Sequence, residues 1–374
     1  MAKLQTYVTG NGDERRTLVV VFLRGGADGL NLVAPLDDDG YYKARPRIGI
    51  SRKDAVPLDG FFGLNPLMKD LEPAWKEGLM SVIHQAGSED TTRSHFEAQD
   101  LMEHGGVVAG GWLGRFLRFR NGAPAGALSA VALGRELPEC LRGAPSATVI
   151  QSLDVFSLGG NSAKLQRQLA GLYGLETGPL GGAARDTMAA LERIETLRAT
   201  PYLPANGAEY ARDEFSQGLR QIARLIKSRV GLESASLDLN GWDSHLNQGA
   251  IMDPRILNLA QGLAAFTKDL GGAMATTSVV VMTEFGRRVV ENSAFGTDHG
   301  RASVMFVLGG GVTGGKVFAN WSGLKEELLE GPGDLPVVFN YRNVLAPVLQ
   351  RHGAGADLSK IFPDFTVEPM AIHG

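Results

Sequence analysis

The chain has 374 residues, enough to bury a sizeable core in one large α/β domain or in two smaller ones. Lys and Arg number 37 against 41 Asp and Glu, which gives neither a basic surface for nucleic acid nor an acidic tail, so we expect no nucleic-acid partner. Cys140 is the only cysteine, which excludes an intrachain disulfide and a cysteine-rich metal cluster.

Short apolar or β-branched runs recur along the chain and predict buried strands. They lie at Thr17–Leu23, Leu79–His84, Leu128–Leu133, Ser236–Leu239, Thr277–Thr283 and Ser303–Leu308. Most are separated by segments with helical periodicity, which favours an α/β fold with a largely parallel sheet covered on both faces. All the apolar stretches are shorter than the roughly 20 residues that a membrane helix needs, so no membrane span is predicted.

Several connecting segments read as helices. Asp253 and Pro254 suit a helix start, and a helical stripe follows at Ile256, Leu259, Leu263, Phe266 and Leu270. A second start is predicted at Asn65-Pro66. Residues 161–230, including a helix over Asp213–Val230, carry helical patterns and little strand signal, so they form a helical insertion or cap, or the crossover helices of the sheet. No linker is evident, and we predict one domain over residues 1–374.

Polar side chains follow several of the predicted strands. They are Asp28 after the first, Asp243 and His245 after the strand near Leu239, Glu284 after Thr283, and Asp298 and His299 just before Ser303. Ligands of α/β sheets bind at the carboxyl ends of strands, and this mixture of carboxylates and imidazoles suits one or two divalent ions: zinc, manganese, calcium or magnesium. The alternative is that Asp28 shapes a turn and Asp243 caps a helix.

Another candidate segment, around Ser94, follows the strand that ends near His84. Ser94 with Glu97 three residues later matches a capping box, the structural interpretation. The same geometry places a hydroxyl at a helix N-terminus, where an anion is stabilised. Ser94 is therefore the candidate nucleophile, with Thr92 or a water activated by the metal as alternatives. His95 is a base, a ligand or a core residue.

Arginines lie beside these segments, and Arg287 is the one we assign to catalysis. A guanidinium group binds tetrahedral oxyanions through paired N–H donors, although it equally neutralises a neighbouring carboxylate.

Five motifs carry a family resemblance: FLRGGADGLN, RSHFEAQDLME, NGWDSHLNQ, VVVMTEFGRR and GTDHGRAS, in this order. Together they resemble the domain-of-unknown-function 1501 family of the sulfatase-like and alkaline phosphatase superfamily, over Thr17 to Lys316. The resemblance implies an alkaline-phosphatase-like α/β/α sandwich, with Asp28, Asp243, His245, Glu284 and His299 at metal positions and Ser94 near the nucleophile. Glu284-Phe285 stands where that superfamily has an Asp-His pair, so two full zinc sites are not expected.

The resemblance also bears on location and reaction. Many relatives are exported, which implies a periplasmic or secreted protein, whereas no export signal is visible here, which leaves the cytoplasm open. Cys140-Leu-Arg departs from the motif that sulfatases convert to formylglycine. We predict a metal-dependent hydrolase of phosphate or sulfate esters that acts on a small-molecule or polymer substrate. The alternatives are a non-catalytic metal- or anion-binding protein and a transferase with the same ligands.

Overall fold

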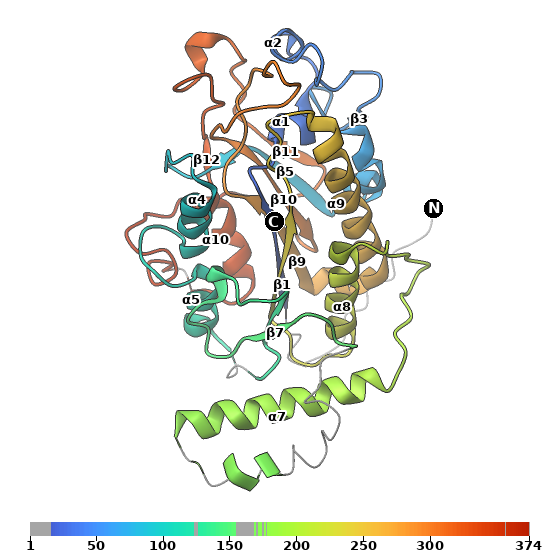
Figure 1. The fold of residues 1–374 in the computed structure, drawn as a ribbon, viewed down its shortest axis with the longest axis vertical. Coiled ribbons are helices and arrows are strands. Elements are labelled where there is room, and N and C mark those ends of the chain that lie inside the picture. Colours follow the sequence, from blue (N-terminus) through green and yellow to red (C-terminus); the bar gives the residue numbers. More distant parts are fainter. Residues whose placement is uncertain are drawn as a thin grey trace.

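A largely parallel sheet forms the middle layer of the protein (Figure 1). The computed structural model describes residues 16–122, 126–154, 168–169, 171–173, 176, 178–355 and 357–373. Across these residues the strand order is β11 (Lys316–Phe318), β5 (Met80–Gly87), β10 (Ser303–Gly309), β9 (Thr277–Thr283), β1 (Thr17–Arg24), β8 (Ser234–Asn240), β6 (Ala130–Leu133) and β7 (Thr148–Ile150), with β12 (Phe339–Asn340) also paired to β5. Only β10 runs antiparallel to its neighbours β5 and β9 among these pairings.

Alternate residues of each central strand face two different helical layers. In β1, Val19, Val21 and Leu23 join one core, whereas Leu18, Val20 and Phe22 join the other. Helices η1 (Pro66–Leu71), α3 (Glu72–Lys76), α8 (Glu214–Lys227) and α9 (Gln248–Leu270) cover the first face; α4 (His95–His104), α5 (Trp112–Phe119) and α10 (Tyr341–Arg351) cover the second. The predicted fold class, a three-layer α/β/α sandwich, is thereby confirmed.

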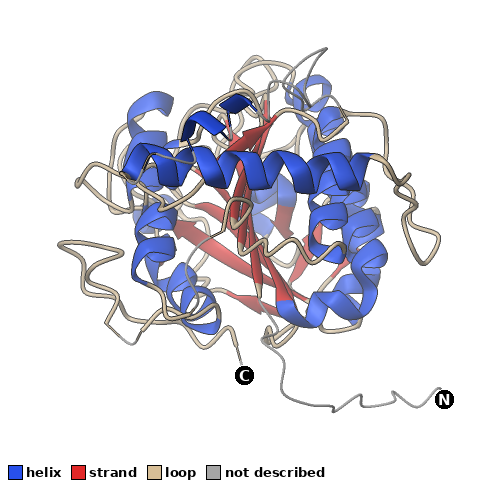
Figure 2. Cartoon of the chain, turned by 90° about the horizontal axis from the view of Figure 1, so that it is seen from below, coloured by secondary structure: helices blue, strands red, loops and turns tan. Residues whose placement is uncertain are grey.

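Smaller elements complete the chain. They are α1 (Gly29–Leu32), α2 (Asp39–Ala44), η2 (Glu139–Leu141), η3 (Gly271–Thr276), η4 (Glu326–Leu328), and a small sheet of β2 (Val33–Pro35), β4 (Phe62–Leu64) and β3 (Val56–Pro57). Helix α7 (Pro179–Arg198) crosses the end of the sheet where β1 begins, away from α1, as the view from below in Figure 2 also shows. Much of the predicted helical region 161–230 before α7 lies outside the described residues.

All six predicted strands are present, with ends shifted by three residues at most. The predicted helix start at Asp253 is wrong, because α9 begins at Gln248 and Pro254 lies inside it. The preceding turn belongs to the helix because Gln248 and Met252 are buried there, and tertiary packing outweighs the preference of Pro for a first turn. No described helix is both long enough and apolar enough to span a bilayer.

Candidate metal centre

Strand direction brings distant segments to one edge of the sheet. Strands β1, β8 and β9 run parallel, so the loops that follow them meet at their carboxyl ends. Strand β10 runs the opposite way, so the residues that precede it, including His299, arrive at the same edge. The loop after β5 leads there too and ends in α4, whose first residue is His95. Gly25 allows a close approach, since a Cβ there would lie 2.6 Å from the backbone nitrogen of Asp243.

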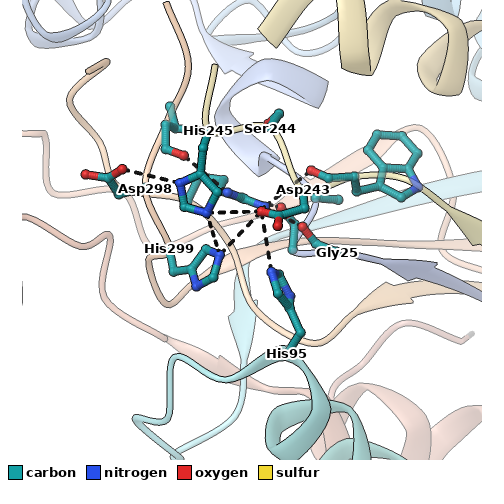
Figure 3. A network of polar contacts seen from close by, with 12 residues as sticks. Gly25, His95, Asp243, Ser244, His245, Asp298 and His299 are labelled. Atoms are coloured by element: carbon teal, nitrogen blue, oxygen red, sulfur yellow. Dashed lines mark hydrogen bonds and ion pairs between the residues drawn. The ribbon is translucent and has the colours of Figure 1, made fainter. Parts of the chain in front are cut away.

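Four side chains from these segments converge (Figure 3). Ligand atoms of His95, Asp243 and His299 all lie within 4.8 Å of one another. The Oδ1 atom of Asp243 is 3.4 Å from Nε2 of both His95 and His299. It is also 3.1 Å from Nε2 of His245, which in turn is 2.8 Å from Nε2 of His299. A tetrahedral zinc site with bonds of about 2.0–2.1 Å has ligand-to-ligand edges of roughly 3.4 Å.

Each of the three imidazoles uses its other nitrogen, Nδ1, to contact an acceptor. His95 Nδ1 is 2.8 Å from Glu284 Oε1, His299 Nδ1 is 2.8 Å from the carbonyl oxygen of Arg93, and His245 Nδ1 is 3.4 Å from Asp298 Oδ1. Carbonyl and carboxylate oxygens only accept, so each Nδ1 carries the proton. In the neutral rings all three Nε2 lone pairs then face Asp243 and one another, which is the arrangement of ligands around a cation.

The environment of His95 Nε2 supports the fit of a metal ion. This atom is buried and has no hydrogen-bond partner within the described structure. The bond to Glu284 raises the pKa of His95, while burial opposes that change. The Nε2 lone pairs of His245 and His299 also face each other at 2.8 Å, a repulsive contact unless a proton or a metal ion lies between them. The residues present therefore fit a single divalent ion.

Arg287 supports the carboxylate of Asp243 from behind. Its side chain is fully buried and donates to Asp243 Oδ1 at 2.7 Å. The other donors of the guanidinium group bind backbone carbonyls of Gly25, Gly26 and Thr297. Partial burial acts to raise the pKa of Asp243, but Arg287 and the nearby imidazoles outweigh it and lower the pKa to about 2. Arg287 is thus held as a support for the site, with its donors already used.

Glu284 lies one layer behind the cluster. Its Oε1 atom accepts from the Gly25 N–H, from Gln99 Nε2 and from His95 Nδ1, each at 2.8 Å. Burial acts to raise the pKa of Glu284, yet these donors lower it, so the group stays ionised. Glu284, predicted as a ligand, therefore orients His95 instead, and His95, for which the sequence left the roles of base, ligand and core residue open, faces the cluster.

Asp28 does not join the cluster. Its two carboxylate oxygens lie 2.6 and 3.0 Å from the guanidinium nitrogens of Arg45, and Gln248 Nε2 donates to it at 2.7 Å. Both side chains of the ion pair are at most 1% exposed. Asp298 also stands apart, beside His245, Asn292 and Arg288.

Ser94 occupies the N-cap position of α4 but makes no capping bond with its side chain. Glu97, the predicted partner in a capping box, instead accepts a 2.7 Å bond from the hydroxyl of Thr92. Ser94 is exposed at the start of the helix, directly before His95. The capping-box alternative is therefore not what the structure contains, and the hydroxyl is not engaged by the helix.

Sequence reasoning missed two residues that bind predicted ligands: Gln99, which donates to Glu284, and Arg45, which pairs with Asp28. Gln99 follows His95 by four residues and so shares its face of α4, a spacing that could have identified it. Arg45 lies in no motif, and nothing in the sequence indicated that it pairs with Asp28.

Comparison with known proteins gives a family and several distant structural likenesses. None of the curated proteins matches the chain. Among solved structures, the C-terminal periplasmic domain of EcEptC from Escherichia coli, in complex with Zn, is similar with 11% identity and a TM-score of 0.36, over 80% of this chain and 74% of that chain. The lipoteichoic acid synthase LtaP from Listeria monocytogenes has 9% identity and a TM-score of 0.38, over 91% of this chain and 72% of that one.

The alkaline phosphatase from the Antarctic bacterium TAB5 is similar with 9% identity and a TM-score of 0.27, over 82% of this chain and 95% of that one. Likenesses this distant say nothing about the activity of the present chain. The family described as protein of unknown function (DUF1501) matches residues 182–357, which contain Asp243, His245, Glu284 and His299. The predicted resemblance to the DUF1501 family is thereby confirmed over residues 182–357.

Proposed function

We propose that the protein is a metal-dependent hydrolase of phosphate or sulfate esters with one divalent ion at the candidate centre. The observation that carries the proposal is the convergence of the Nε2 atoms of His95, His245 and His299 on Oδ1 of Asp243, with every Nδ1 bonded to an acceptor. A set of three imidazoles and one carboxylate favours zinc or another borderline ion over calcium or magnesium. A second ion is not proposed, because Asp28 and Glu284 are bound by protein donors.

The helix that carries His95 adds a site for the anionic group. Helix α4 is ten residues long and starts at His95, so the free N–H groups of its first turn lie beside the cluster. These donors and the partial positive charge of the helix end stabilise a tetrahedral oxyanion. When bound, the ion polarises an oxygen of the ester and so stabilises the charge that develops there.

Ser94 is the proposed nucleophile. Its exposed hydroxyl is placed at the helix start next to His95. Oγ gives its proton to solvent water and forms the new bond to phosphorus or sulfur, while the bond to the alcohol oxygen breaks and that oxygen takes up a proton from water. Water then releases the phosphate or sulfate from the serine. Thr92 is a poorer candidate because its hydroxyl already donates to Glu97.

Elemental analysis with matched variants tests the metal. We expect about one zinc or manganese ion per chain in the wild type and none in His95→Gln. His104→Gln is the control, since His104 contacts Glu139 at 3.1 Å much as His95 contacts Glu284, but lies outside the cluster. Retention of the ion by His95→Gln, or its absence from the wild type after incubation with zinc and manganese, overturns the proposed centre.

Hydrolysis of a panel of phosphate and sulfate esters tests the reaction. Metal-loaded wild type is expected to turn over at least one class, and Ser94→Ala to lower kcat by about 100-fold or more with the metal content unchanged. Unchanged kcat in Ser94→Ala would assign the attack to water. A loaded protein that binds the anions but turns over no ester is a binding protein, not a hydrolase.

A further inference from the structure

Large apolar side chains are exposed on the segments that carry the metal-site histidines. Phe96 follows His95 and is 84% exposed, and Leu246 follows His245 and is 61% exposed. Phe295, 50% exposed, precedes Gly296, where a Cβ would lie 2.3 Å from the carbonyl carbon of His245. A phenylalanine as exposed as Phe96 is unusual, because leaving its ring in water forfeits the free energy that burial of the ring would provide. We call these three residues the apolar rim.

Two backbone hydrogen bonds join the loop that carries Leu246 to the loop that carries Phe295. The backbone N–H groups of Asn247 and Gln248 bind the carbonyls of Ala294 and Phe295 at 2.8 Å. Phe295 has a φ of 60°, in the left-handed region that a bulky residue rarely adopts. The backbone at Phe295 is therefore strained, and the hydrogen bonds between the two loops offset the energetic cost of this conformation.

Each arginine near the apolar surface is paired with a carboxylate, so the attraction for an anion comes from the metal centre and the N-terminus of α4. The guanidinium group of Arg47 lies 4.2 Å from the centre of the Phe295 ring and is held by Glu291 at 2.5 Å. Arg288 pairs with Asp298 behind His245. A ligand that complements this face has an anionic head and an apolar body joined to it.

We infer that the ester substrate is amphiphilic, with its phosphate or sulfate group at the metal centre and an alkyl or aryl alcohol part lying on the apolar rim of Phe96, Leu246 and Phe295. This inference rests on the proposed function and adds the substrate class. It commits the rim to the substrate itself, because Phe96 and Leu246 each directly follow a histidine of the cluster, on two separate segments of the chain.

Calorimetric binding of n-alkylphosphonates and n-alkyl sulfates, from ethyl to octyl, to the zinc-loaded protein tests the inference without turnover. For the series that binds, each added methylene is expected to tighten Kd by about two- to fourfold in the wild type. The double variant Phe96→Ser/Leu246→Ser is expected to bind the ethyl compound within about twofold of wild type and to lose most of this dependence on chain length. The double variant Phe119→Ser/Leu203→Ser changes exposed residues of the same kinds elsewhere and is expected to retain it.

Equal affinity for all chain lengths in the wild type, or the wild-type dependence in the rim variant, overturns the inference and leaves the hydrolase proposal intact. A rim variant that changes only the mass of the particle in solution, or only its binding to phosphatidylcholine vesicles, assigns the rim to a second copy of the chain or to a bilayer and also overturns it. If no member of either series binds zinc-loaded protein, the proposed function fails and the inference fails with it.

Discussion

Asp28→Asn separates a ligand from a structural ion pair. Asp28 and Arg45 are both at most 1% exposed, and their closest contact is 2.6 Å. The asparagine keeps the shape of the side chain but removes its charge, so the buried Arg45 cation is left with neutral acceptors alone: the amide oxygen and the carbonyls of Val289 and Arg288. Breaking one partner of a buried pair in this way costs about 3–5 kcal/mol.

Urea unfolding and elemental analysis of the same preparations provide the assay. We expect Asp28→Asn to lose about 3–5 kcal/mol of unfolding free energy and to bind zinc in the wild-type amount. Asp37→Asn is the control, since its ion pair with Arg52 is about 60% exposed on both sides and is screened by solvent, so the unfolding free energy is expected to stay close to that of the wild type. Asp243→Asn is expected to show the reverse, with the ion lost and a smaller decrease in stability, because Asp243 is 48% exposed.

One result would refute this reasoning: zinc lost from Asp28→Asn with the unfolding free energy unchanged. Asp28 would then be a ligand, as the sequence predicted. If Asp28→Asn fails to fold, the double variant Asp28→Asn/Arg45→Gln removes the uncompensated cation and is expected to fold and to bind zinc.

Three further predictions concern support, acid stability and the ion itself. Gln99→Leu removes a 2.8 Å donor from Glu284 and is expected to weaken zinc affinity by about 10–100-fold in a competition titration. The control is Asp100→Asn, which changes an exposed neighbour and is expected to leave the affinity unchanged. Equal zinc affinities of Gln99→Leu and the wild type would exclude a role for Gln99. Burial lowers the pKa of His352 to about 3, whereas in the unfolded chain the imidazole takes up its proton near pH 6.5, so the unfolding free energy falls as the pH drops from about 6.5 toward 3. His352→Gln should reduce the slope of unfolding free energy against pH by about 1.4 kcal/mol per pH unit near pH 5. An unchanged slope contradicts this prediction. Zinc at 100 times its Kd should raise the unfolding free energy by about 2.7 kcal/mol, and a chelator should reverse this gain. An unfolding curve that does not change with zinc would disprove the prediction.

The strands were predictable because each has a local signature. An apolar run such as Thr277–Thr283 is buried on both faces whatever its neighbours are, so its sequence alone indicates a central strand. Short edge strands such as β7 and β11 have no such run, and their pairing depends on the sheet being already in place. The start of α9 was missed for a related reason, since Gln248 is buried by contacts with Asp28 and Thr297 that lie far away in the chain.

The site was predictable as a set of residues, but not as a set of roles. Strand ends identified Asp243 and His245, because residues after parallel strands meet at one edge regardless of side-chain details. His299 lies before a strand and reaches the same edge because that strand, β10, runs antiparallel to its neighbours. Whether a carboxylate binds an ion or a protein donor depends on contacts across the chain: Arg45 reaches Asp28 from 17 residues away, and Gln99 reaches Glu284 from 185. Gly25, Gln99 and His95 all donate to one oxygen of Glu284, so that carboxylate already has its hydrogen-bond partners. The atom available to a metal ion is then Nε2 of His95. The position of Glu284 behind His95 thus follows from the hydrogen bonds of the folded chain, which the order of residues does not contain.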